Sequence, residues 1–333
     1  MRRLAVLLLV AACASTPAAS PHKAATPSPS SRSVAAPSAS ASAPAPARAL
    51  AWHAGPSLPL AVSEVGVAAL GSSVHVIGGY VGGHPRSTTH LVFDTVSGRW
   101  HKAAPLPVAA DHVGVVALGG KLWAVGGYGD PSSLRSWDPA TDRWTSHTPL
   151  PSGRAAGVCV VLGGRIHYVG GKSNGADVST QLVYDPASDR WSTAAPLPVA
   201  RDHAAGAVVD GKLYVAVGRP GDLTDAEVYD PSTDRWRRLP AVPLGRSSVA
   251  GASFDGYFLV IGGEHPREQG VETEVDAYDL SAGRWRKLPS LPSGRQGIGA
   301  AVVNGVLYVP GGGPAGGGAL QSNVLLELSA TGG

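Results

Sequence analysis

LWAVGGYGDPSSLRSWDPATDRW, residues 122–144, carries the landmarks that decide the fold. An apolar run ends at Gly126 and Gly127, an aromatic residue precedes an acid at Trp137, and a second tryptophan, Trp144, ends the stretch. Short apolar runs bounded by Gly, Pro, Asp and Ser are typical of β-strands joined by tight turns. The stretch therefore predicts short antiparallel strands rather than helix.

The same landmarks recur in phase along most of the chain. Tryptophans stand 44 to 49 residues apart, a period typical of propeller blades, at Trp52, Trp100, Trp144, Trp191, Trp236 and Trp285. Glycine pairs end apolar runs at Gly78 and Gly79, Gly126 and Gly127, Gly170 and Gly171, Gly262 and Gly263, and Gly311 and Gly312. The fourth repeat departs from this pattern and has Val217 and Gly218 instead. The recurrence predicts an all-β fold, a six-bladed β-propeller.

Local chemistry explains how one repeat makes a sheet and how the ring of sheets closes. In Asp138 to Asp142 the proline fixes φ and the first aspartate can accept hydrogen bonds from the turn backbone, which predicts a hairpin between the last two strands of the repeat. The last repeat ends without a tryptophan, whereas Trp52 has no repeat before it. We therefore expect residues 49–54 to form the outermost strand of the sixth blade and to close the ring.

The combination of a double glycine, an aromatic residue followed by aspartate, and a spaced tryptophan resembles the Kelch repeat. The aromatic residues of this motif are Phe93, Trp137, Tyr184, Tyr229 and Tyr278, each followed by aspartate. The resemblance covers the chain from about residue 50 to its end. It implies a propeller scaffold, which is compatible with many functions.

Composition excludes two classes of protein. The chain has 44 Gly and 28 Pro but only 15% charged residues, which favours short strands and turns over helices. Its net charge is +3 and its longest basic run lies at Arg235 to Arg238, so it lacks the clustered positive charge of a nucleic-acid-binding protein. We expect no nucleic-acid partner.

The first 48 residues differ from the repeats. Arg2 and Arg3 precede an apolar run too short to span a bilayer, which predicts a cleaved signal peptide over residues 1–12. Val10 to Cys13 resembles the lipobox of bacterial lipoproteins, which implies a lipid on Cys13; a secretory signal with a chance cysteine is the alternative. Residues 13–48, rich in Ala, Ser and Pro, predict a disordered tether before a propeller over residues 49–333. We expect an exported protein, anchored on the outer side of the membrane, or secreted if Cys13 is not acylated.

Charged side chains recur just before the innermost strand, where the repeats of a propeller converge on one mouth of the channel. Four repeats place an arginine there: Arg154, Arg201, Arg246 and Arg295. Other charged or titratable residues at or beside this position are Glu64 in repeat one, Asp111 and His112 in repeat two, and Asp202 and His203 in repeat four. We expect the arginines and Glu64 to bind an anionic or polyhydroxylated ligand, because guanidinium groups donate in pairs to carboxylates and vicinal oxygens. The alternative is that each arginine is structural and binds loop carbonyls.

Two classes of function stay open. The first is a binding module that presents a rigid face to a glycan, peptide or protein outside the cell, and that meets the membrane only through its lipid. The second is an enzyme similar to the exported Kelch-like mutarotases that epimerise sialic acid, with acid and base groups from Asp111, His112, Asp202 and His203. We expect no cofactor, and no metal either, because the histidines lack metal-ligand spacing.

Overall fold

The computed structural model describes residues 49–265, 270–315 and 321–331. These residues form strands and turns, and no helix among them is long and apolar enough to cross a membrane. The expected signal peptide, Cys13 and the expected tether lie outside the described residues.

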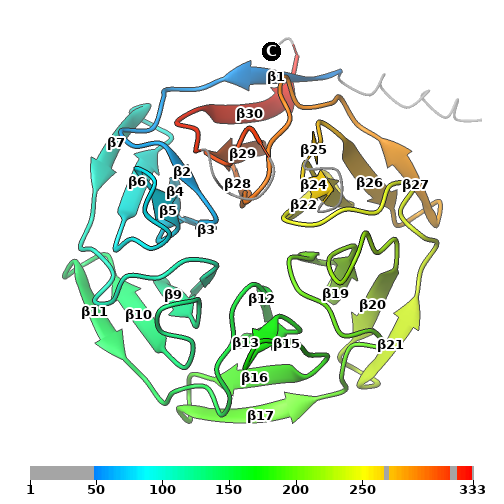
Figure 1. Cartoon of the computed structure of the whole chain (residues 1–333), viewed down its shortest axis with the longest axis horizontal. Coiled ribbons are helices and arrows are strands. Elements are labelled where there is room, and N and C mark those ends of the chain that lie inside the picture. The colour runs from blue at the N-terminus through cyan, green and yellow to red at the C-terminus, as the bar shows by residue number, and fades with distance from the viewer. Residues whose placement is uncertain (1–48, 266–269, 316–320, 332–333) are drawn as a thin grey trace, which may run out of the picture. The chain divides into compact units, whose positions relative to one another are not determined.

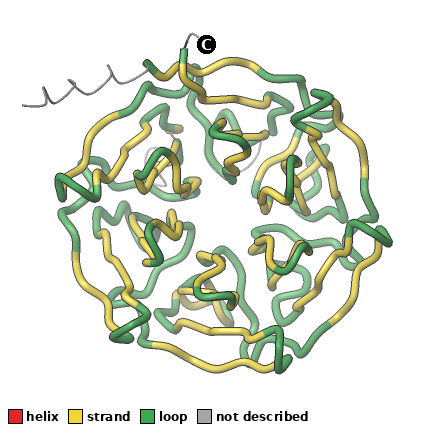
Figure 2. Tube along the Cα trace, turned by 180° about the vertical axis from the view of Figure 1, so that it is seen from behind, coloured by secondary structure: helices red, strands yellow, loops and turns green. Residues whose placement is uncertain are grey.

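Six four-stranded antiparallel sheets stand around a central axis like the blades of a propeller (Figures 1 and 2). The strands of each blade are named below from the innermost, at the axis, to the outermost. Blade one contains β3 (Gly66–Leu70), β4 (Ser73–Ile77), β6 (His90–Asp94) and β7 (Arg99–Lys102). Blade two contains β8 (Gly114–Leu118), β9 (Lys121–Val125), β10 (Leu134–Asp138) and β11 (Arg143–Ser146). Blade three contains β12 (Val158–Leu162), β13 (Arg165–Val169), β16 (Gln181–Asp185) and β17 (Arg190–Ala194).

The second half of the ring repeats this arrangement. Blade four contains β18 (Ala205–Val209), β19 (Lys212–Ala216), β20 (Ala226–Asp230) and β21 (Arg235–Arg238). Blade five contains β22 (Ala250–Phe254), β23 (Tyr257–Ile261), β26 (Val275–Asp279) and β27 (Arg284–Lys287). Blade six contains β28 (Ala301–Val303), β29 (Val306–Pro310), β30 (Leu325–Ala330) and β1 (Leu50–Ala54). Two-residue strands pair as β2 (Val62–Ser63) with β5 (Tyr80–Val81), β14 (Lys172–Ser173) with β15 (Ala176–Asp177), and β24 (Glu264–His265) with β25 (Gly270–Val271).

The first described strand completes the last blade, as the sequence predicted. β1 pairs antiparallel with β30, with Trp52 opposite Leu328 (Figure 1). The outermost strand of blade six therefore comes from the opposite end of the folded chain. This pairing closes the ring without leaving an open sheet edge at the seam.

The spaced tryptophans join neighbouring blades. Each indole Nε1 donates a hydrogen bond to a carbonyl oxygen four residues after the tryptophan of the preceding blade, at 2.8 or 2.9 Å. The acceptors for Trp52, Trp100, Trp144, Trp191, Trp236 and Trp285 are Pro289, Pro56, Ala104, Thr148, Ala195 and Pro240, in that order. Trp52, on the closing strand β1, makes the same bond to the blade before it as the other five tryptophans do. The tryptophan period therefore records a contact between blades.

The predicted turn and packing signals appear where expected. Oδ1 of Asp138 accepts a hydrogen bond from the backbone N–H of Ala140 at 2.9 Å, which fixes the hairpin of β10 and β11. Gly126 has a positive φ of 60°, and a Cβ there would collide with the carbonyl oxygen of Arg154. A glycine at this strand end therefore lets the next blade approach closely.

Removing the closing strand tests this architecture. Deletion of residues 49–54 eliminates β1 and the Trp52 bond, so we expect the melting temperature of the chain to fall by about 10 °C or more. Differential scanning calorimetry measures it. Deletion of residues 30–35, of the same length but outside the propeller repeats, serves as the control and should leave the melt unchanged. If both deletions melt like the parent chain, the closing role of β1 is wrong.

Candidate functional site

One residue from each blade meets at the mouth of the axial channel. All six have a positive φ, between 51° and 61°, and they are Glu64, His112, Ala156, His203, Ser248 and Gly297. The backbone N–H of each donates to the carbonyl oxygen of the equivalent residue in the preceding blade, at 2.7 to 3.3 Å. Gly297 donates to Ser248 and Glu64 donates to Gly297, so the bonds run round the whole channel. We call these six residues the mouth ring.

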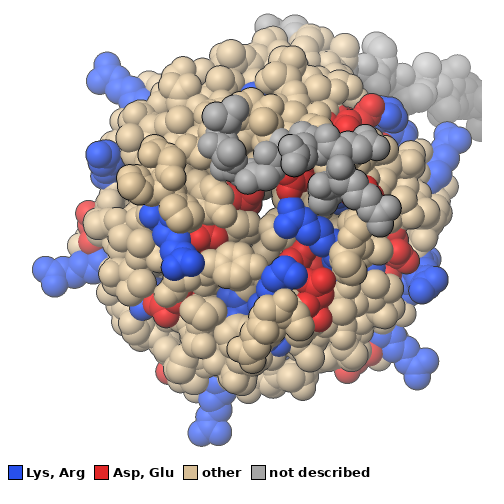
Figure 3. All heavy atoms as spheres, viewed as in Figure 1, with Lys and Arg blue, Asp and Glu red and all other residues tan. Residues whose placement is uncertain are grey.

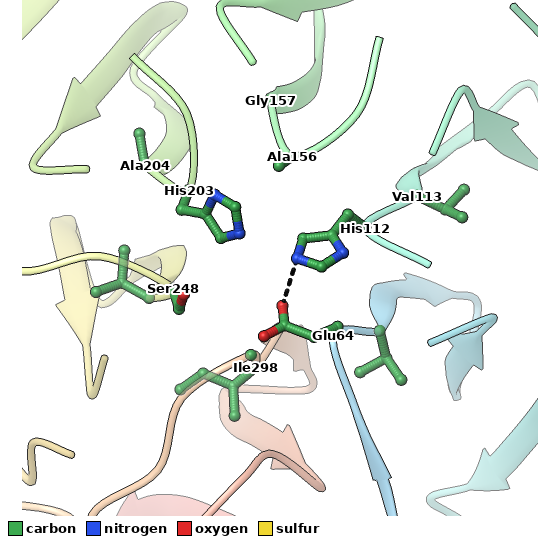
Figure 4. A pocket seen from close by; sticks show the side chains of 12 residues that line it. Glu64, His112, Val113, Ala156, Gly157, His203, Ala204, Ser248 and Ile298 are labelled. Carbon is green, nitrogen blue, oxygen red and sulfur yellow. Dashed lines mark ion pairs between the residues drawn. The ribbon is translucent and has the colours of Figure 1, made fainter. Parts of the chain in front are cut away.

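The mouth ring holds ordinary residues in a conformation that favours glycine. Five of its six members carry a side chain although φ lies in the left-handed region. That region is costly for such residues, and they persist in it where the surroundings fix the backbone. Here the circular hydrogen bonds fix it, and the side chains of Glu64, His112 and His203 point toward one another across the channel (Figure 4).

The mouth ring lines a small polar cavity of about 110 Å³. All six of its members contribute to the wall, together with apolar residues of the inner strands such as Val113 and Ile298. Deeper along the axis the wall changes to residues such as Gly206 and Ala207. Among the described residues, the charged side chains that line the channel are therefore at the mouth.

Glu64, His112 and His203 form the chemical centre of the cavity. Nε2 of His112 lies 2.9 Å from Oε2 of Glu64, and each of these two side chains is 9% exposed. The imidazole rings of His112 and His203 are 4.8 Å apart between centroids and nearly perpendicular, at 76°. A donor atom from each of the three residues lies within 4.8 Å of the other two, close enough to hold a metal ion.

A buried aspartate stands directly before each histidine. Oδ1 of Asp111 contacts Nδ1 of His112 at a short distance, and Oδ1 of Asp202 lies 3.0 Å from Nδ1 of His203. Both aspartates are at most 2% exposed. Asp111 orients the ring of His112 through this hydrogen bond, and Asp202 lies beside the ring of His203 as an ion-pair partner.

The surroundings drive the pKa values of the two histidines apart. Burial disfavours a charged His112, but the charge of Glu64 and the bonds to Asp111 and Glu64 outweigh it and raise its pKa to about 10. Burial dominates at His203 and lowers its pKa despite the contact with Asp202. Burial would raise the pKa of Glu64, but the positive charge and hydrogen bond of His112 lower it to about 2. One protonated and one neutral imidazole therefore face each other at neutral pH.

A second layer of side chains surrounds the mouth ring. The residue after each glycine landmark pairs by its backbone with the residue just before a mouth-ring member. These residues, which we call the outer ring, are Tyr80, Tyr128, Lys172, Arg219, Glu264 and Gly313. Both tyrosine rings lie against His112, at 6.0 and 5.2 Å between centroids.

Ion pairs hold the two cations of the outer ring. Nζ of Lys172 lies 3.2 Å from Oδ2 of Asp202, and Arg219 forms a short ion pair with Glu264. The side chains of both cations are 30% exposed. Figure 3 shows charges of both signs gathered around the hollow at the centre of this face.

The four recurring arginines lie elsewhere. None of Arg154, Arg201, Arg246 and Arg295 is among the described residues that line the cavity, and each is at most 3% exposed. Three of them donate to the carbonyl oxygen sixteen residues further along, at the end of the second strand of their own blade. This placement supports the structural alternative, because buried guanidinium groups that bind carbonyl oxygens of their own blade do not reach a ligand in the cavity. The repeats do converge on the mouth, but through the residue two positions after each arginine.

Two of these arginines form ion pairs with buried carboxylates. Nη1 of Arg246 lies 2.8 Å from Oδ2 of Asp276, and both side chains are 0% exposed. Nη2 of Arg201 lies 2.9 Å from Oε1 of Glu227. Arg295 binds the carbonyl oxygen of Gly311 at 2.9 Å, and burial lowers its pKa to about 10.

Comparisons with known proteins agree with this architecture. Residues 64–263 match the family model described as the KLHDC2/KLHL20/DRC7 Kelch-repeats domain, and residues 245–292 match the Kelch motif. A solved structure titled "Structure of YjhT" superposes with a TM-score of 0.72 at 19% identity, covering 83% of this chain and 97% of that one. At this identity the likeness concerns the fold alone. No curated protein sequence matches the chain.

Substitution of the buried pair Arg246 and Asp276 in blade five tests whether this arginine is structural or binds a ligand. Arg246→Met leaves Asp276 as an uncompensated buried charge, so we expect a loss of about 3–5 kcal/mol in the free energy of unfolding, measured by urea denaturation. Arg246→Met combined with Asp276→Leu should recover most of this loss. Arg165→Ala, which breaks an exposed pair with Asp185, should cost about 1 kcal/mol or less. A fully stable Arg246→Met chain would refute the structural role.

Proposed function

Because the chain belongs to the Kelch-repeat family of β-propellers, we propose that it is a binding module that holds a small polyhydroxylated or acidic ligand, such as the terminal sugar of a glycan, at the channel mouth. The observation that carries this proposal is the double layer of polar side chains around one cavity. The mouth ring supplies Glu64 and the two histidines, and the outer ring supplies two tyrosines and two cations.

The outer ring suits a sugar or a carboxylate. Tyr80 and Tyr128 are half-buried and can cover an apolar sugar face, while their hydroxyl groups stay available for hydrogen bonding. Lys172 and Arg219 are partly exposed cations at the same opening. A guanidinium group donates in pairs to a carboxylate or to vicinal hydroxyls.

The size of the cavity limits how deeply a ligand enters. Its 110 Å³ has room for several water molecules or one substituent, since a water needs only about 10–15 Å³ of such space. We infer that a single hydroxyl, carboxylate or short side chain of the ligand enters the mouth ring. The rest of the ligand lies against the outer ring, where specificity is set.

The proposed place of action is outside the cytoplasm. The basic and apolar N-terminal segment, with its resemblance to a lipobox at Cys13, supports export and lipid anchoring. An exported binding module would meet glycans, peptides and proteins at the cell surface.

A second candidate function is a sugar mutarotase, and the opposed protonation of the two histidines favours it. Mutarotation needs an acid that protonates the ring oxygen while a base removes the proton of the anomeric hydroxyl group, and the reverse on ring closure. Protonated His112 can supply the acid and neutral His203 the base, because their pKa values lie on opposite sides of neutral pH. Asp111 and Asp202 lie beside Nδ1 of the two rings.

A binding experiment tests the first function. The full chain, screened on a glycan array, is expected to bind glycans with acidic or hydroxyl-rich ends. Arg219→Gln should weaken that binding about 10- to 100-fold, the value of a charge-assisted hydrogen bond. Arg165→Gln, at an exposed arginine on β13, is the matched control and should bind like the parent chain. Equal loss in both variants, or no glycan bound, would speak against the proposal.

Anomer exchange tests the second function. If the chain is a mutarotase, it should accelerate the exchange of N-acetylneuraminate anomers followed by NMR. His203→Ala should reduce the acceleration about 100-fold or more, because it removes the base. Ala156 occupies the equivalent position of blade three, so the backbone there accepts alanine. An exchange rate equal to that in buffer would eliminate this candidate and leave the binding module.

A further inference from the structure

Glu64, His112 and His203 bring the donor set of a metal centre to one point on the channel axis. They are the group of three His, Cys, Asp or Glu side chains that the described residues place within reach of one ion. The carboxylate comes from blade one and the imidazoles from blades two and four. Two histidines and one glutamate are the protein ligands of a common class of catalytic zinc site.

The residues behind the histidines fit the same chemistry. A metal-ligating imidazole usually gives its second ring nitrogen to a carboxylate, which fixes the ring and raises its basicity. Asp111 contacts Nδ1 of His112, and Asp202 lies 3.0 Å from Nδ1 of His203. Nε2 of His112 faces Glu64 at 2.9 Å, on the cavity side. The Asp-His dipeptide occurs at the mouth in two blades, and in both the aspartate lies beside Nδ1 of its histidine.

We propose that Glu64, His112 and His203 bind a divalent transition-metal ion, zinc by preference, at the channel mouth. Ligand atoms around tetrahedral zinc lie about 3.3 Å apart, given Zn–N and Zn–O distances of about 2.0–2.2 Å. The donor atoms of the triad already lie within 4.8 Å of one another. Side-chain movements of about 1–2 Å therefore complete three corners of a tetrahedron.

The backbone of the mouth ring supports this geometry. Each ligand sits at a position whose φ is fixed by hydrogen bonds to both neighbouring blades. In a site on a rigid scaffold, little free energy is needed to order the metal-ligating side chains. The fourth corner of the tetrahedron faces the polar cavity, where a water molecule or an oxygen of a ligand can bind.

The zinc site goes beyond the binding module proposed above. A bound ion would replace the proton on Nε2 of His112 and offer an electrophilic centre to a hydroxyl or carboxylate oxygen. Zinc binding and sugar binding can be measured separately, since the first needs no sugar and the second can be measured in chelator. Failure of one does not imply failure of the other.

Isothermal titration of zinc chloride into the chelator-stripped full chain tests the site. We expect one zinc ion per chain. His112→Ala and His203→Ala should each weaken binding about 100-fold or more, and Asp202→Asn about 10- to 100-fold, as for residues that orient a metal-ligating histidine. His101→Ala, at an exposed histidine on β7, is the control and should bind zinc like the parent chain.

Folding of the variants is checked by thermal melts in chelator. Alanine is native at the equivalent position Ala156, and Glu64→Gln, which keeps the side-chain shape, provides a third ligand variant. Zinc should raise the melting temperature of the parent chain and of His101→Ala, but not that of the three ligand variants. The proposal is overturned if the double variant of His112→Ala and His203→Ala binds zinc as tightly as the parent. It is also overturned if the parent binds no zinc.

Discussion

The backbone hydrogen bonds of the mouth ring are the constraint on which the rest of the site depends. Six sheets of similar sequence can bury one another's faces only as a closed ring, and at the channel mouth each blade is tied to the one before it through a residue with positive φ. The outer strands repeat this linkage through the tryptophan indoles. Because both circles of bonds include the seam at Trp52 and Glu64, the position of every mouth residue is fixed by all six blades.

The proposed site lies at positions where the residue type differs from blade to blade. The landmarks that build the blades, namely the glycine pairs, the tryptophans and the buried arginines, serve contacts within and between blades. The mouth ring requires a left-handed backbone conformation, and within that limit its side chains range from glycine to glutamate. Glu64, His112 and His203 use this freedom to build a charged centre. The residues of the outer ring also differ from blade to blade, and they add two tyrosines and two cations.

Much of the fold followed from the sequence, whereas the site followed only in part. The tryptophan period and the missing tryptophan of the last repeat were enough to predict six blades and the closing strand, because both record contacts that every blade must make. Asp111, His112, Asp202, His203 and Glu64 were candidates because they are charged or titratable residues at or beside the recurring arginine position. The arginines were expected at the channel because the sequence shows that they recur but not which way their side chains point. The residue that reaches the mouth lies two positions after each arginine, and the arginine itself is buried in the blade. Spacing along the chain also could not indicate a triad drawn from blades one, two and four. The residue after each glycine landmark was an available signal for Tyr128, Lys172 and Arg219.

Anomalous diffraction at the zinc absorption edge, from crystals of the zinc-loaded chain, tests most directly whether the mouth ring is the functional centre. We expect a single strong peak on the channel axis, bounded by Glu64, His112 and His203, with one coordination position open to the cavity. A peak at another site, or a mouth that holds only water beside an intact pair of Glu64 and His112, would contradict this view of the molecule.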